Sequence, residues 1–245
     1  MIPIRTNLDN HYAVVLHSYN YQNSSLIVNF FLRDYGKVSA IARGAKRKRA
    51  KDNSFSLLQP FQNIMVSLTG KQELLILKTI EATQTHWKLS GKALYCAYYI
   101  NELLLRLLPS ETECVELFLL YNKTLCLLAE NSIQFEAPLR IFELKLLEFL
   151  GYGLNLDYSI DSERPIDADK TYYYRIGSGA SEKKVFAPDS LPISGKTLVD
   201  LGQLKLTDVK TLQQSKQLLK WALAEHLGDK PLKSREIFKQ LYVAN

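Results

Sequence analysis

The chain has 245 residues, of which 47% are hydrophobic and 23% charged. This composition is typical of a soluble globular protein and excludes disordered, collagen-like and coiled-coil chains. The length allows one large domain or two smaller ones. Its cysteines, Cys96, Cys114 and Cys126, are widely spaced, so they predict neither a disulfide framework nor a tetrahedral zinc site and favour a reducing compartment. Because no signal peptide or apolar span is recognisable, we expect a cytoplasmic protein without a membrane segment.

Charge is distributed unevenly along the chain. The formal net charge of +6 divides into +7 over residues 1–80, −5 over residues 81–204 and +4 over residues 205–245. The densest run, residues 43–51, holds six cations in nine positions and no acidic residue. Such a run fits a solvated loop or a localisation-like tract, and it also fits a surface whose mutual repulsion is offset by a bound polyanion.

Residues 11–82 alternate with period two and are rich in β-branched and aromatic residues, which predicts strands. We expect these strands at about 12–19, 26–33, 37–43, 61–68 and 74–82. Turn residues such as Asp34-Tyr35-Gly36 separate them. Five short strands with one long connection between the third and the fourth predict a small closed barrel, with the OB-fold as the leading candidate. The long connection carries the basic run.

After the barrel, the apolar period changes to that of helices. Helices are expected over residues 92–108, 110–129 and 137–150, and their apolar stripes are interpreted as core. Ser110 and Glu113 have the spacing of a capping box for the second of them.

Residues 152–191 are turn-rich and predict a small, irregular β insertion. Helices follow at about 195–201, 208–227 and 234–242. The predicted fold class is therefore α+β. An N-terminal OB-fold β-barrel over residues 1–80 precedes an α-helical domain over residues 81–245, which contains the insertion.

No catalytic group is visible in the sequence. The four histidines are scattered, and there is no nucleophile elbow and no cysteine near a histidine. Gly195-Lys196-Thr197 matches the end of a phosphate-binding loop, but Ser190 stands where its first glycine is required, and a helix capped by Ser194 explains the segment better. Gly177-Ser178-Gly179 is interpreted as a hairpin turn. We expect no enzyme, no cofactor and no metal.

A small barrel with a basic loop is a platform for single-stranded nucleic acid, where cations follow the phosphates and aromatic rings stack on bases. Tyr19, Tyr21, Phe31 and Tyr35 are candidates for stacking, although each also fits the barrel core. The candidate phosphate contacts are Arg33, Lys37, Arg43, Lys46, Arg47, Lys48, Arg49 and Lys51.

A family resemblance adds to this interpretation. Its motifs include Val15-Leu16-His17-Ser18-Tyr19, Asp34-Tyr35-Gly36-Lys37, Ala42-Arg43-Gly44-Ala45-Lys46, Leu58-Gln59-Pro60-Phe61, Tyr99-Ile100-Asn101-Glu102, Leu150-Gly151-Tyr152-Gly153 and Lys230-Pro231-Leu232-Lys233-Ser234-Arg235. In this order they resemble the bacterial recombination mediators of the RecO family over nearly the whole chain. The resemblance implies a DNA repair protein, associated with the nucleoid, that binds single- and double-stranded DNA and anneals complementary strands. It also implies that the protein works with RecR to load RecA onto DNA covered by single-stranded DNA-binding protein (SSB).

The resemblance also implies binding sites. The SSB tail is acidic and ends in an aromatic residue with a free carboxylate, so its receptor needs an apolar slot beside a cation. Arg140 matches the family's tail-binding position, with Leu139, Phe142 and Leu146 as neighbours, while a solvent-facing Arg140 in the first helical turn is the alternative. The basic tail with Lys230, Lys233 and Arg235 is a second candidate DNA contact, or else a cap on the helical core.

One departure from the family concerns zinc. Many members carry a four-cysteine zinc site after the Gly151-Tyr152-Gly153 segment, whereas this chain has no cysteine beyond Cys126, so we expect none. An RNA-binding OB-fold accessory protein is the alternative function, and an enzyme built on residues 195–197 is a third.

Overall fold

The computed structural model describes residues 6–46, 54–70, 74–84, 87–110, 112–130, 134–184 and 190–242. The chain forms two compact units. Unit 1 comprises Met1–Ser132 together with Leu232–Asn245, and unit 2 comprises Ile133–Pro231. Unit 1 is therefore discontinuous in sequence, and it groups the predicted barrel with helices that the sequence assigned to a separate domain.

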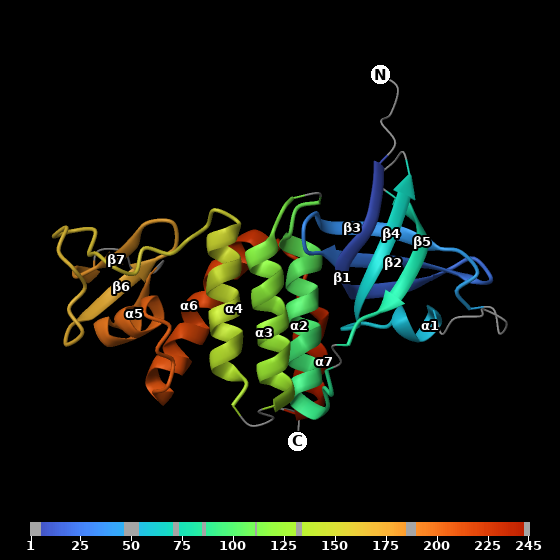
Figure 1. The fold of residues 1–245 in the computed structure, drawn as a ribbon. Coiled ribbons are helices and arrows are strands. Elements are labelled where there is room, and N and C mark those ends of the chain that lie inside the picture. The colour runs from blue at the N-terminus through green and yellow to red at the C-terminus, as the bar shows by residue number, and fades with distance from the viewer. Residues whose placement is uncertain are drawn as a thin grey trace. The chain divides into compact units, whose positions relative to one another are not determined.

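A closed five-stranded barrel forms the first part of unit 1. Its strands are β1 (Thr6–Tyr21), β2 (Ser25–Leu32), β3 (Gly36–Ala42), β4 (Asn63–Gly70) and β5 (Leu74–Ala82). The order around the barrel is β1-β2-β3-β5-β4, with β3 and β5 parallel and the other pairs antiparallel (Figure 1). The short helix α1 (Ser54–Leu57) lies in the connection between β3 and β4. This topology confirms the predicted OB-fold barrel.

Alternation of apolar residues explains how the barrel is filled. Along β3, buried and half-buried residues alternate strictly, and Val28, Phe30 and Ile64 contribute to the interior cluster. A register shift between Val15 and His17 interrupts the pairing of β1 with β2. Phe31, which alternates with the core residues Phe30 and Leu32, lies on the outer face of the barrel and is covered by Phe118 of the helical part of unit 1.

Unit 1 also contains three longer helices, α2 (Gly91–Leu107), α3 (Val115–Glu130) and α7 (Lys233–Tyr242). Helix α2 packs against β1, α3 and α7 (Figure 1). The buried Asn101 of α2 donates to the Leu16 carbonyl at 2.8 Å and accepts from the Tyr121 hydroxyl at 2.7 Å. One amide thus joins β1, α2 and α3.

The predicted capping box at Ser110 is wrong, because α3 begins only at Val115. Ser110 forms a parallel β-bridge with Lys37 instead. The adjacent Gly36 has a φ of +78°, and a Cβ there would collide with the Thr112 carbonyl. The barrel therefore holds this segment extended, and tertiary contact overrides the local capping signal.

Unit 2 combines helices with a small sheet. Its elements are α4 (Glu136–Phe149), β6 (Thr171–Arg175), β7 (Gly179–Ser181), β8 (Leu191–Ser194), α5 (Gly195–Gly202) and α6 (Val209–Leu227). The strand order β7-β6-β8 confirms the expected β insertion, and α4 packs beside α6 (Figure 1). Phe149, expected on the core stripe of α4, is instead exposed.

The segment that resembles a phosphate-binding loop is a helix start, as the sequence predicts. The Ser194 hydroxyl accepts from the Thr197 amide at 3.2 Å and caps α5. Gly195 is required because a Cβ would collide with the Asp167 carbonyl. Within the described ranges, no helix has the length and apolar character needed to cross a bilayer.

Candidate nucleic-acid interface

One end of the barrel gathers the hairpin between β1 and β2 and the turn after β3. Tyr21 pairs with Ser25, and Leu26 pairs with Ala42, so these strand ends are neighbours. The Lys46 amide donates to the Ser24 carbonyl at 3.0 Å, which brings the turn back to the hairpin. Arg43 is exposed and Lys46 half-buried, so two of the predicted phosphate contacts lie beside the hairpin.

An aromatic pair on β1 faces outward. His17 and Tyr19 are two residues apart, and their ring centroids lie 4.3 Å apart at an interplanar angle of 66°. Tyr19 is 48% exposed, which leaves its ring accessible to a nucleobase. Burial, and after it the positive charge of Lys233, lower the pKa of His17. The charge of Lys233 therefore influences His17, although more than 200 residues separate it from β1 in the sequence.

The start of α7 is fixed by Glu102 of α2. Its carboxylate accepts from the Lys233 amide at 2.9 Å, and from the Ser234 amide at 2.9 Å and hydroxyl at 2.6 Å. These amides belong to the N-terminal turn, whose N–H groups have no partner within the helix. Arg235 donates to the Tyr99 hydroxyl at 2.8 Å, with its guanidinium 5.0 Å from the ring centroid. Lys233 is left exposed, whereas Arg235 anchors the helix.

Other predicted contacts contribute to packing. The Lys37 ammonium donates to the Leu105 carbonyl at 2.8 Å, and burial lowers its pKa. Tyr35 packs against the barrel core. Phe31 is fully buried, with its ring 5.3 Å from that of Phe118, so the interpretation of Phe31 as a stacking residue is wrong. These three side chains therefore contribute to packing within unit 1.

The remaining predicted DNA contacts are scattered. Arg33 pairs with Asp34 at 2.8 Å and lies 5.2 Å from the Tyr12 ring centroid, near the far end of β2. Lys230 is exposed in unit 2. Arg47, Lys48, Arg49 and Lys51 lie outside the described residues.

The predicted SSB-tail residues are internal. Arg140 and Glu143 form an ion pair at 2.6 Å, with side chains 7% and 1% exposed. The Arg140 Nε is buried and has no hydrogen-bond partner among the described residues. Leu139, Phe142 and Leu146 are buried as well. The alternative of a solvent-facing Arg140 is therefore wrong.

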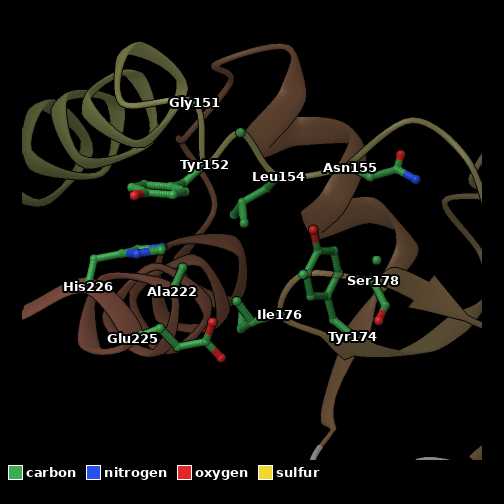
Figure 2. Close-up of a pocket in the computed structure, with 13 residues that line it drawn as sticks. Gly151, Tyr152, Leu154, Asn155, Tyr174, Ile176, Ser178, Ala222, Glu225 and His226 are labelled. Carbon is green, nitrogen blue, oxygen red and sulfur yellow. The ribbon is translucent and has the colours of Figure 1, made fainter. Parts of the chain in front are cut away.

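Unit 2 also contains a cavity of about 280 Å³ between α6 and the loops around Tyr152 and Ser178. Tyr152 stacks on His226, with ring centroids 3.6 Å apart and an interplanar angle of 13° (Figure 2). This histidine packs on an aromatic ring rather than beside a nucleophile. Among the described residues, no three histidine, cysteine or acidic side chains are grouped as metal ligands. The absence of an enzymatic role and of zinc stay predictions.

Sequence reasoning missed His17 and Glu102 as contributors to the interface. Both left a signal in the sequence. His17 precedes Tyr19 by two positions in a strand pattern, and Glu102 is an acidic residue in an apolar helix. The sequence did not reveal that the start of α7 would bind Glu102 and bring the charge of Lys233 near His17.

The fold and this surface define a class of protein in which an OB-fold barrel, suited to binding polyanions, is joined to a helical region. Two family models match the chain, "Recombination protein O N terminal" over residues 8–86 and "Recombination protein O C terminal" over residues 89–236. The chain belongs to the RecO family of DNA repair and recombination proteins.

Full-length relatives agree with this assignment. The chain is 42% identical over 229 residues to the DNA repair protein RecO of Nitrosococcus oceani, which covers 94% of this chain and 92% of the relative. It is 40% identical over 241 residues to that of Dechloromonas aromatica, covering 97% and 98%. For Serratia proteamaculans the identity is 39% over 228 residues, covering 93% and 92%.

Proposed function

We propose that the protein is a recombination mediator that binds single- and double-stranded DNA and anneals complementary strands. The observation that carries this proposal is the surface formed by Tyr19, Arg43, Lys46 and Lys233, which we call the hairpin surface. It combines an accessible aromatic ring on β1 with cations from two separate segments, the turn after β3 and the start of α7. Stacking and phosphate contact are the two interactions by which proteins hold single strands without sequence preference.

Annealing follows from the same chemistry. Two strands repel each other through their phosphates, and cations that neutralise this charge let complementary bases meet. Because the cations of the hairpin surface contact phosphates rather than base edges, both single and double strands are bound. This role needs neither a catalytic group nor a cofactor, and it places the protein in the cytoplasm on the nucleoid.

We further propose that the protein works with RecR to load RecA onto SSB-covered DNA, and that the SSB tail docks on the helical region around Arg140. Family membership supports both partnerships. The Arg140–Glu143 pair supports a positioning role for Arg140 within α4, because both side chains are buried and Arg140 is held by its neighbour on the same helix.

The annealing of SSB-covered complementary strands tests the proposed function. We expect annealing by the wild type and by K205E, an exposed control in unit 2, and its loss in the double variant R43E/K46E. Binding of matched RNA without any annealing would favour an RNA-binding accessory protein. Turnover in a nucleotide hydrolysis assay would contradict the non-enzymatic role.

A further inference from the structure

A second pocket in unit 1, of about 400 Å³, lies between the barrel and α3. Tyr12 and Ile64 line it from the barrel, Phe118 and Leu119 from α3, and Trp87 from the segment before α2. Tyr12 is 45% exposed. The pocket is at the end of β1 and β2 remote from the hairpin surface, because Tyr12 lies near the start of the paired region and Tyr21 at its end.

Two buried nitrogen donors in this pocket have no acceptor. Asn63 Nδ2 and Trp87 Nε1 are both inaccessible and find no hydrogen-bond partner among the described residues. Asn63 is only 8% exposed as a whole. An unpaired buried donor is destabilising, so the pair indicates that an acceptor from a ligand completes the site.

Two cations line the pocket together with the neutral donors. Arg33 is 40% exposed beside Tyr12, and Lys123 is exposed on α3. Aromatic side chains beside neutral donors and exposed cations suit a neutral ring with carbonyl oxygens that is joined to a phosphate.

We propose that this pocket holds one base of a bound single strand. The carbonyl oxygens of a base such as thymine accept from Asn63 and Trp87 once these side chains turn their buried donors toward the ligand. The ring packs on the aromatic wall, and the adjacent phosphate meets Arg33 and Lys123. The inference rests on the proposed function and adds to it a base-holding site separate from Tyr19.

Tryptophan fluorescence gives a direct test, because the chain has two tryptophans, Trp87 and Trp221. In a W221F protein, a short oligothymidylate should change the emission of Trp87, whereas an abasic oligomer with the same number of phosphates should not. The anisotropy of labelled oligomers reports binding independently. Oligothymidylate that binds without changing Trp87 emission overturns the pocket but leaves the proposed function standing, whereas absence of any DNA binding overturns both. An acidic peptide with an apolar end that changes the emission where oligothymidylate does not would assign the pocket to a protein partner and overturn the inference.

The variant N63L gives a second test, in which stability and DNA affinity should change in opposite directions. Removing an unpaired buried amide should raise the melting temperature, while affinity for oligothymidylate falls about threefold to tenfold and affinity for the abasic oligomer stays the same. N29L is the matched control. Asn29 accepts from Ser39 at 2.7 Å, so its loss should lower the melting temperature and leave DNA affinity unchanged. Equal oligothymidylate affinity in N63L and wild type overturns the inference.

Discussion

Arg140 and Glu143 show how much one buried pair constrains a helix. The two side chains are 7% and 1% exposed, so the ion pair between them joins charges that water scarcely reaches. Removing one partner of such a pair leaves an uncompensated buried charge, whereas replacing both by apolar residues is often neutral. The two kinds of substitution therefore separate the stability of unit 2 from the proposed docking of the SSB tail.

We expect R140A to lower the free energy of unfolding by about 3–5 kcal/mol, and R140L/E143L to remain close to the wild type, as measured by urea denaturation. The folded double variant should bind an SSB-tail peptide more weakly and DNA equally well. Undiminished binding of the tail peptide would contradict a role for Arg140 in docking.

His17 links protonation to the hairpin surface. Its pKa lies below the usual value of 6.5, through burial first and the charge of Lys233 second. Above that pH the imidazole is neutral in the folded and unfolded states alike. As the pH falls below about 6.5, the unfolded chain takes up the proton more readily, so this histidine makes the fold less stable.

The variant K233A should therefore raise the pKa of His17, as followed by NMR titration of the imidazole. K239A, which removes an exposed lysine from the last turn of the same helix, is the control and should leave this pKa unchanged. If the two variants give the same titration curve as the wild type, Lys233 does not act on this face.

The strands and most helices could be predicted because their apolar residues recur with the period of a strand or of a helix. Alternation located β5 at its observed bounds, and Asp208 and Gly228 bracket α6 as capping residues. The start of α3 could not be predicted, since the pairing of Ser110 with Lys37 depends on the barrel. Local sequence signals predict an element's bounds where its own capping residues and apolar stripe stabilise it. They fail where contact with a segment distant in sequence determines where the element begins.

The same distinction divides the candidate site. Tyr19, Arg43 and Lys46 lie on strands or turns whose neighbours are close in sequence, so local pattern sufficed to select them. Lys37 and Arg235 were predicted to contact DNA from their charge and from the family motifs that contain them, with a cap on the helical core as the alternative for the segment of Arg235. Their partners, the Leu105 carbonyl and the Tyr99 hydroxyl, become visible only when the chain is folded.

Helix α7 provides a prediction about Glu102. Replacing Glu102 by alanine removes the acceptor for the first amides of the helix, which should cost about 0.5–2 kcal/mol, as for the loss of a helix cap. We expect faster hydrogen exchange in α7 and weaker DNA binding, because Lys233 loses its position. E225A, at an exposed site on α6, should change neither, and unaltered exchange in α7 would show that Glu102 is dispensable.

For the molecule as a whole, salt dependence measures how many cations meet DNA. If four to eight phosphates of a single strand are neutralised, the logarithm of affinity should fall with the logarithm of salt concentration with a slope of about −3 to −6. The variant R43E/K46E should reduce the size of this slope by about 1.4, with K205E as control. A slope equal to that of the wild type would exclude both residues from phosphate contact.

The interrupted sequence of unit 1 has a consequence for biosynthesis. Because the unit begins with the barrel but ends with residues 232–245, its last helix leaves the ribosome after all of unit 2 has been made. The barrel can close before unit 2 is complete, since its strands precede that unit in the chain. Lys233 joins His17 and Tyr19 only after unit 2 has been made, so a shorter nascent chain carries an incomplete hairpin surface, and a stop codon that removes α7 deletes part of unit 1.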